Sequence, residues 1–391
     1  MELNPLLRRA VELGASDIHL KVGLPPILRR DGDLRPLEEC AVVTDRDTEA
    51  VVEHLGKRSR ERLESFKQTG DLDIAYQEED LPRFRVNAFR QRGHISVALR
   101  VIPKNVPNFE ALHMPQGVRR LADEHRGLVL VTGATGSGKT TTLAAMIDHI
   151  NRSRQQHIVT IEDPIEILHS DHSCIVNQRE IGLDTPDFTQ ALRRALRQDP
   201  YVILIGELRD AETAQTALQA AESGHLVLST MHTVDAAETI GRMVEFFPAG
   251  KQQMIRSIMA GVLRGIVSQR LLPRIAGGRI AAVEVMVTNS RIADLIRDNQ
   301  PESVIDAIEE GAFFDMQSFT QALLDLVVTE NVDREIAANA ATNRHDFLVS
   351  LERALKQRTA DVKAAEKRAE AETKAAAEEN ELPGLRLARA E

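Results

Sequence analysis

The chain has 391 residues, enough for two or three domains of ordinary size. Its formal net charge is −10, and it has no tryptophan and only two tyrosines, so neither its charge nor its aromatic content is typical of a nucleic-acid-binding protein. No apolar run approaches the ~20 residues of a membrane helix, and two cysteines, Cys40 and Cys174, are too few for a four-cysteine zinc site. We therefore expect a cytoplasmic protein with reduced thiols, no nucleic-acid partner and no direct membrane insertion.

Residues 1–103 combine a helix-like start with alternating apolar and polar segments. "DIHLKV" and "RFRVNAF" show this alternation, and "GLPP" and "DGD" are turn signals between such segments. These patterns predict a small α+β domain. Residues 104–126 begin in a stretch with two prolines and no clear period, which predicts an interdomain linker.

From Gly127 onward, short apolar strands alternate with helical patterns. The strand signals are "GLVLVTG", "HIVTIED", "YVILIGE" and "GHLVLSTMH". Such alternation favours an α/β domain with a parallel sheet covered on both faces, here over residues 127–289. Residues 290–357 are predicted to be helical, and the Ala, Glu and Lys rich tail 358–391 is predicted to be a solvated helix or disordered.

A phosphate-binding motif follows the first of these strands. "GATGSGKT" has the G-x4-G-K-[ST] spacing and opens a helix, which is the context that the motif requires. Small residues let backbone N–H groups surround phosphate oxygens, the lysine meets the terminal phosphates, and the threonine hydroxyl binds Mg2+. The motif therefore predicts a bound purine nucleoside triphosphate. Its expected contacts are Gly133, Ala134, Thr135, Gly136, Ser137, Gly138, Lys139, Thr140 and Thr141.

Carboxylates follow two further predicted strands. "TIEDPIE" places Glu162 and Glu166 after one of them; the group is either a solvated turn or a set of ligands for Mg2+ or its water shell. Glu207 follows "VILI", and Gly206 stands before it where many P-loop enzymes place a magnesium-binding aspartate. A lone carboxylate at the edge of the sheet that faces the nucleotide can orient or deprotonate the attacking water.

Two histidines flank the strand in "SGHLVLSTMHT". His225 and His232 are seven residues apart, so along one strand they face opposite sides, and a joint metal site is not expected. His232 is the better candidate for sensing the terminal phosphate. His225 is either a structural hydrogen-bonded histidine or a nucleotide contact.

Several segments together resemble the secretion-superfamily hexameric ATPases, and within them the PilT-like ATPases that retract type IV pili. The first domain shares "SDIHL", "GLPPILRRDGDLRPL" and "RFRVNAFRQRG". The second shares, in family order, "GATGSGKTTT", "TIEDPIE", "VNQREIGLDTPDFTQALRRALRQDP", "ILIGELRDAETAQTALQAAESGHLVLSTMHT" and "EFFPAGKQQMIR". The resemblance covers roughly residues 1–355.

The resemblance implies a PAS-like N-terminal α+β domain followed by a RecA-like P-loop NTPase domain and a helical C-terminal region. It implies a homohexamer that hydrolyses ATP with Mg2+ at the cytoplasmic face of the inner membrane. There it would act with the pilus machinery on a membrane platform protein and drive pilus retraction and twitching motility. The implied roles are Mg2+ binding by Thr140 and Glu166, and catalysis by Glu207, Glu166, His232, Arg85 and Arg100, with Glu162 and His225 at the nucleotide.

Two departures from the family pattern leave alternatives open. Tyr201 stands where relatives commonly have aspartate, and Ser290 to Ala293 stand where retraction ATPases usually read Ala-Ile-Arg. The second departure keeps an accessory retraction paralogue open. A pilus-extension or type II secretion ATPase is disfavoured by the missing zinc cysteines, a nucleic-acid translocase by the composition, and a non-hydrolysing regulatory subunit by Glu207, Glu166 and Arg85.

Overall fold

The structure, a computed structural model, describes residues 2–30, 32–57, 60–102 and 106–358. The chain divides into two compact units, residues 1–108 with 143–207, and residues 109–142 with 208–391. The divisions at 142/143 and 207/208 fall within the phosphate-binding helix and just after a strand that ends at Ile205, and the domain boundaries expected at 103, 127 and 289 stay a prediction. The expected tail lies outside the described residues from 359 onward.

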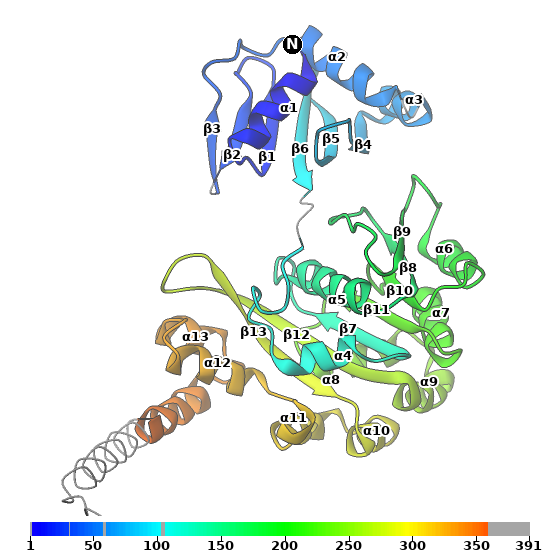
Figure 1. The fold of residues 1–391 in the computed structure, drawn as a ribbon, viewed down its shortest axis with the longest axis vertical. Helices are drawn as coiled ribbons and strands as arrows, with labels where there is room; N and C mark the ends of the chain where they lie inside the picture. The colour runs from blue at the N-terminus through cyan, green and yellow to red at the C-terminus, as the bar shows by residue number, and fades with distance from the viewer. Residues whose placement is uncertain (1, 31, 58–59, 103–105, 359–391) are drawn as a thin grey trace, which may run out of the picture. The chain divides into compact units, whose positions relative to one another are not determined.

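The N-terminal part of the first unit is an α+β arrangement, as the sequence predicts (Figure 1). Its antiparallel sheet has the order β3-β2-β1-β6-β5-β4. The strands are β1 (Asp17–Lys21), β2 (Ile27–Arg30), β3 (Asp33–Pro36), β4 (Asp71–Tyr76), β5 (Arg83–Gln91) and β6 (His94–Ile102), and the helices are α1 (Leu3–Glu12), α2 (Asp45–Gly56) and α3 (Arg60–Thr69). Alternate residues of β5, Phe84, Val86 and Ala88, are buried in its core.

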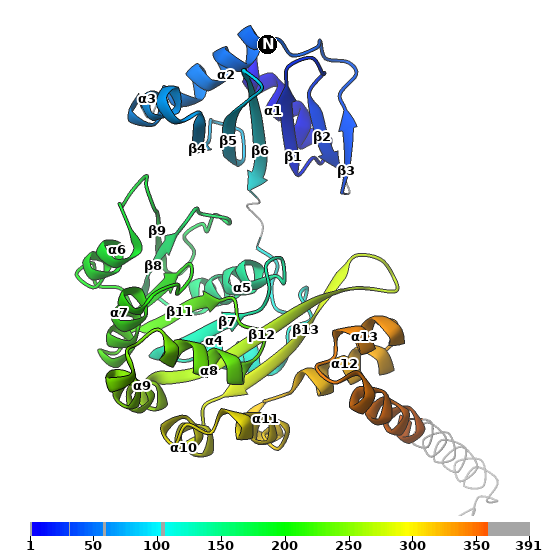
Figure 2. The same cartoon turned by 180° about the vertical axis from the view of Figure 1, so that it is seen from behind.

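Among the described residues, a second sheet has the order β13-β12-β7-β11-β10-β8-β9 (Figures 1 and 2). Its strands are β7 (Gly127–Thr132), β8 (His157–Glu162), β9 (Ile175–Glu180), β10 (Val202–Ile205), β11 (Leu226–Met231), β12 (Leu263–Pro273) and β13 (Arg279–Val287). The pairs β8–β10 and β7–β11 are parallel, as expected, and the pairs β8–β9 and β7–β12, whose strands β9 and β12 were not predicted, are parallel too. The antiparallel pair β12–β13 was not predicted.

Helices separate most of these strands. They are α4 (Gln116–Ala122), α5 (Lys139–Ser153), α6 (Phe188–Ala195), α7 (Ala211–Glu222), α8 (Ala236–Glu245) and α9 (Ala249–Val262). The expected linker 104–126 therefore contains a helix, and Val118 and Leu121 of α4 are fully buried, so this part of the segment belongs to the folded unit.

The C-terminal region is helical, as expected. It comprises α10 (Ser290–Arg297), the 3-10 turn η1 (Pro301–Ser303), α11 (Val304–Glu309), the 3-10 turn η2 (Ala312–Phe314), α12 (Phe319–Val328), α13 (Arg334–Ala340) and a final helix over 344–358. A hydrophobic cluster that includes Leu272, Phe319 and Phe347 packs α12 and α13 against β12 and β13. In the described part of the chain, no helix is both long and apolar enough to cross a membrane.

Candidate active site

The phosphate loop connects the buried strand β7 to α5. All six residues of β7 are buried, and residues 133–138 form the turn before α5 begins at Lys139. Gly133 has a φ of 139°, and a Cβ there would lie 2.5 Å from the carbonyl oxygen of Gln269 and 2.6 Å from Ser137 Oγ. Only glycine fits this close approach. The backbone N–H groups at the start of the fifteen-residue helix α5, which follows, are suited to bind an anion.

Polar groups of the loop fit a polyphosphate. Lys139 is 8% exposed, and its Nζ donates to the carbonyl oxygens of Gly133 at 2.7 Å and Ala134 at 3.1 Å. Ser137 Oγ is buried, and among the described residues it has no hydrogen-bond partner. Burying a hydroxyl without a hydrogen-bond partner destabilises the folded state, and the oxygens of a bound phosphate are suitable acceptors for it. Thr140, half-buried in the first turn of α5, is placed where the motif predicts a Mg2+ ligand.

Strand β12 holds this loop from the side. Thr132 Oγ1 donates to Ser268 Oγ at 3.0 Å, and Gln269 Nε2 donates to Thr142 Oγ1 at 2.8 Å. Gln269 is 1% exposed. Both residues of β12 were missed from the sequence; the available signal is the polar pair Ser-Gln inside the otherwise apolar strand "GIVSQRLL".

His232 lies on the phosphate-loop side of β11. Partial burial, together with the charges of Lys139 and Arg209, lowers the pKa of His232. The neutral imidazole that this favours can both donate and accept a hydrogen bond. His232 and Arg209 also line a pocket of about 830 Å3 with residues of α8. The charge of Lys139 thus acts on His232, whose role in sensing the terminal phosphate stays a prediction.

His225 lies at the other end of β11. Its backbone oxygen accepts from the N–H of Gly127, the first residue of β7, whereas the phosphate loop follows the last residue of that strand. Its Nδ1 lies 3.0 Å from the carbonyl oxygen of Ala220 and 3.1 Å from Ser223 Oγ. Six residues of extended strand, about 20 Å, separate His225 from the edge that holds the loop. His225 is therefore hydrogen-bonded at its own end of the strand, away from the phosphate loop, and its contact with a nucleotide stays a prediction.

The aspartate-box segment lies after β8 in the first unit. The Asp163–Pro164 peptide bond is cis, and the Glu166 side chain is exposed. Burial raises the pKa of Glu162; hydrogen bonds from Thr160, Gln178 and the N–H of Glu166 oppose that shift, while the charge of Glu166 adds to it. The Glu162 carboxylate therefore accepts hydrogen bonds from neighbouring groups, whereas the Glu166 side chain is exposed and accessible to solvent or a metal ion.

Glu207 is half-buried just beyond β10. The N–H of Gly206 donates to the carbonyl oxygen of Ile161 at 2.8 Å, which continues the pairing of β10 with β8 past the end of the strand. A Cβ at Gly206 would lie 3.4 Å from that oxygen and 3.5 Å from Glu162 Cα. A side chain at Gly206 would therefore point at the aspartate-box strand.

Arg85 and Arg100 are cross-strand neighbours on β5 and β6. Arg100 Nε donates to Asp17 Oδ1 at 2.9 Å, and Arg29 Nε lies 3.5 Å from Asp17 Oδ2. Burial raises the pKa of Asp17, but hydrogen bonds from Arg100 and Ser16 and the nearby arginine charges hold it below its ordinary value. Arg85 is exposed and lines a pocket of about 360 Å3 within the first unit. The structure thus places the two arginines side by side.

Comparison with known proteins agrees with this geometry. The chain matches the family model of the Type II/IV secretion system proteins over residues 1–358. It is 43% identical over 347 residues to the type IV pilus retractation ATPase PilT of Pseudomonas aeruginosa, a match that covers 89% of this chain and 100% of that protein. It is 38% identical over 348 residues to the type IV pilus ATPase PilU of the same organism, covering 89% of this chain and 90% of PilU.

A crystal structure of the pilus retraction motor PilT with bound ADP has a similar fold. Its TM-score is 0.82 at 41% sequence identity, over 88% of this chain and 98% of that one. The likeness thus covers most of this chain and nearly all of that one. The chain therefore belongs to the Type II/IV secretion system protein family.

Proposed function

We propose that this chain is an ATPase that drives type IV pilus retraction. The observation that carries the proposal is the likeness to PilT over the whole length of that protein, together with a phosphate loop whose Gly133, Ser137 and Lys139 fit a polyphosphate. The motor is a homohexamer docked at the cytoplasmic face of the inner membrane. There it acts with the pilus machinery on a platform protein and removes pilin from the fibre base.

The roles of the residues follow from their positions. Lys139 and the N–H groups at the start of α5 bind the phosphates, and Thr140 with Glu166 holds Mg2+. A Mg2+ ion held by these residues would neutralise charge on the phosphate oxygens. Glu207 orients the attacking water and accepts its proton, so that ATP and water give ADP and phosphate. His232 hydrogen-bonds the terminal phosphate, and the exposed side chain of Arg85, with its neighbour Arg100, supplies positive charge to it.

Coupling of hydrolysis to movement requires that the nucleotide states differ in the domain arrangement that they favour. A ligand with equal affinity for two arrangements does not shift the equilibrium between them. In the proposed motor, Arg85 and Arg100 supply such a difference. The arginines gain a partner when the terminal phosphate is present and lose it after hydrolysis and release.

The function is tested in cells from which this chain is deleted. If the chain drives retraction, these cells should accumulate surface pili that do not shorten, as seen by fluorescence of labelled pili. The wild-type chain should restore retraction, and the Glu207→Gln variant should not. Cells without pili would contradict retraction and favour an extension ATPase.

An accessory retraction motor is the second candidate. The likeness to PilU and the departure at Ser290 to Ala293 favour it. The two candidates differ in one measurement: a principal motor retracts pili when it is the sole retraction ATPase in the cell, whereas an accessory motor only increases retraction force or frequency beside another.

A further inference from the structure

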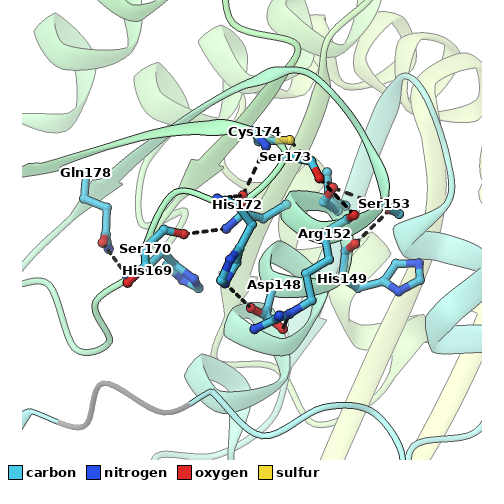
Figure 3. A network of polar contacts seen from close by, with 12 residues as sticks. Asp148, His149, Arg152, Ser153, His169, Ser170, His172, Ser173, Cys174 and Gln178 are labelled. Atoms are coloured by element: carbon cyan, nitrogen blue, oxygen red, sulfur yellow. Dashed lines mark hydrogen bonds and ion pairs between the residues drawn. The ribbon is translucent and has the colours of Figure 1, made fainter.

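Strand β9 carries a glutamine that clamps the aspartate-box segment. Gln178 lies opposite Thr160 in the parallel register of β8 and β9. Its Oε1 accepts from the N–H of His169 at 2.8 Å, and its Nε2 donates to Ile167 O at 2.9 Å and to Glu162 Oε1 at 3.1 Å. Figure 3 shows Gln178 reaching the backbone at His169. Both ends of one amide thus hold both sides of the turn that follows β8.

Glu162 links Gln178 to the backbone of Glu166 through hydrogen bonds. The Glu162 carboxylate accepts from Thr160 Oγ1 at 2.6 Å, from Gln178, and from the backbone N–H of Glu166. The preceding N–H, that of Ile165, donates to Glu180 Oε2 at 3.3 Å. Two consecutive N–H groups of the turn are therefore bonded to carboxylates at the β8–β9 edge, and the backbone of Glu166 is fixed while its side chain stays exposed.

The same segment is anchored to the phosphate-loop helix. Asn151, in the last turns of α5 and 1% exposed, donates from Nδ2 to Ser170 O at 2.7 Å. Its Oδ1 accepts from the N–H groups of His172 at 3.1 Å and Cys174 at 3.3 Å. Nearby, Asp148 Oδ2 accepts from Arg152 Nε at 2.7 Å, and His172 Nε2 lies 3.9 Å from Asp148 Oδ1 (Figure 3). Gln178 therefore joins Glu162 to a segment that is itself hydrogen-bonded to α5.

We propose that Glu162 and Gln178 are positioning residues that fix Glu166 for its work on Mg2+, an inference that rests on the role of Glu166 in the proposed function. A carboxylate taken out of water is costly, and the three donors around Glu162 offset that cost here. A side chain that merely filled this space would be apolar. The arrangement instead resembles the outer hydrogen bonds that orient metal ligands, whose loss typically costs about 10- to 100-fold in metal affinity or activity.

The test uses the full-length protein and two probes, MgCl2 and a fluorescent ADP analogue. Gln178→Leu removes both ends of the clamp, and Asn177→Leu is the matched control, since Asn177 lies next to it on β9 and bonds His157 Nε2 at 2.8 Å instead. For Gln178→Leu we expect about a 10-fold lower kcat and about a 10-fold higher Mg2+ concentration at half-maximal rate. Analogue binding without Mg2+ should match the wild type, and only the gain in affinity on adding Mg2+ should shrink.

An exchange variant separates positioning from folding. Gln178→Glu places two carboxylates together and should be as impaired as Gln178→Leu. Adding Glu162→Gln restores a donor and an acceptor to the pair and should recover part of the Mg2+ dependence, because the bond to Ile167 O, which a carboxylate cannot donate, stays lost.

Three results overturn the inference. One is a Gln178→Leu variant indistinguishable from Asn177→Leu. Another is a loss of Mg2+-free analogue binding in step with a lower Tm, which indicates a structural role only. The third is a Glu166→Gln variant with wild-type Mg2+ dependence, which would show that Glu166 itself has no role at Mg2+. This outcome differs from the first one, in which Glu166→Gln is impaired but Gln178→Leu is not.

Discussion

The side-chain amide of Gln269 donates a 2.8 Å hydrogen bond to the hydroxyl of Thr142, joining β12 to the first turns of the phosphate-loop helix. Gln269→Leu removes this bond and leaves the Thr142 hydroxyl buried. The free energy of unfolding should fall by about 1 to 3 kcal/mol, and nucleotide affinity should fall with it because the start of α5 loses its lateral support. Denaturant unfolding and nucleotide titration measure the two effects. Gln219→Leu, at an exposed position of α7, should change neither; equal values for the two variants would contradict the support role.

His169 should make stability depend on pH. Burial lowers its pKa from 6.5 to about 4, against the opposing charge of Asp148. Because the folded pKa is the lower one, the stability from neutral His169 is present above about pH 6.5 and is lost as pH falls toward 4, by at most about 3 kcal/mol. His169→Leu should unfold with a flatter pH dependence in that window, while the exposed His125→Leu should follow the wild type. A His169→Leu curve parallel to the wild type speaks against a buried neutral imidazole.

Glu284 should act in the opposite direction. Burial and the charge of Asp235 raise its pKa to about 7, although the N–H groups of Ala236 and Phe319 and the charge of Arg270 oppose the shift. With the folded pKa raised, its contribution is full below about pH 4.5 and is lost as pH rises through 7. Glu284→Gln keeps an acceptor for Ala236, so we expect it to be more stable than the wild type at pH 8, by at most about 3 kcal/mol, with the gap closing toward pH 4.5. Thermal unfolding at both pH values decides, and a variant less stable at pH 8 refutes the assignment.

Arg85 should matter for turnover but not for assembly. Because we propose that Arg85 supplies positive charge to the terminal phosphate, Arg85→Ala is expected to lower kcat at least about 10-fold while the protein elutes from size-exclusion chromatography like the wild type. Arg85→Lys should recover only part of the rate, since an ammonium cannot bond phosphate through two parallel donors. Arg35→Ala, at an exposed position on β3, is the control. Wild-type turnover by Arg85→Ala would exclude its catalytic role.

The local parts of this site could be predicted from sequence, whereas the parts that depend on distant segments could not. Gly133, Lys139 and Thr140 form one continuous turn, so their spacing alone predicts their chemistry. Gln269 and Gln178 act through strands whose neighbours are set by sheet order, and β12 and β9 carry no motif that names those neighbours. His225 and His232 flank the apolar run of β11, so their places at opposite ends of that strand could be predicted from the sequence.

ATP turnover by the Glu207→Gln variant tests the proposed catalytic role of Glu207 most directly. If Glu207 accepts the proton of the attacking water, this variant binds ATP with wild-type affinity and loses at least about 100-fold in kcat, whereas Lys139→Ala loses binding itself. Steady-state hydrolysis combined with equilibrium ATP binding by intact rings measures both quantities. Hydrolysis by Glu207→Gln at the wild-type rate would contradict the account.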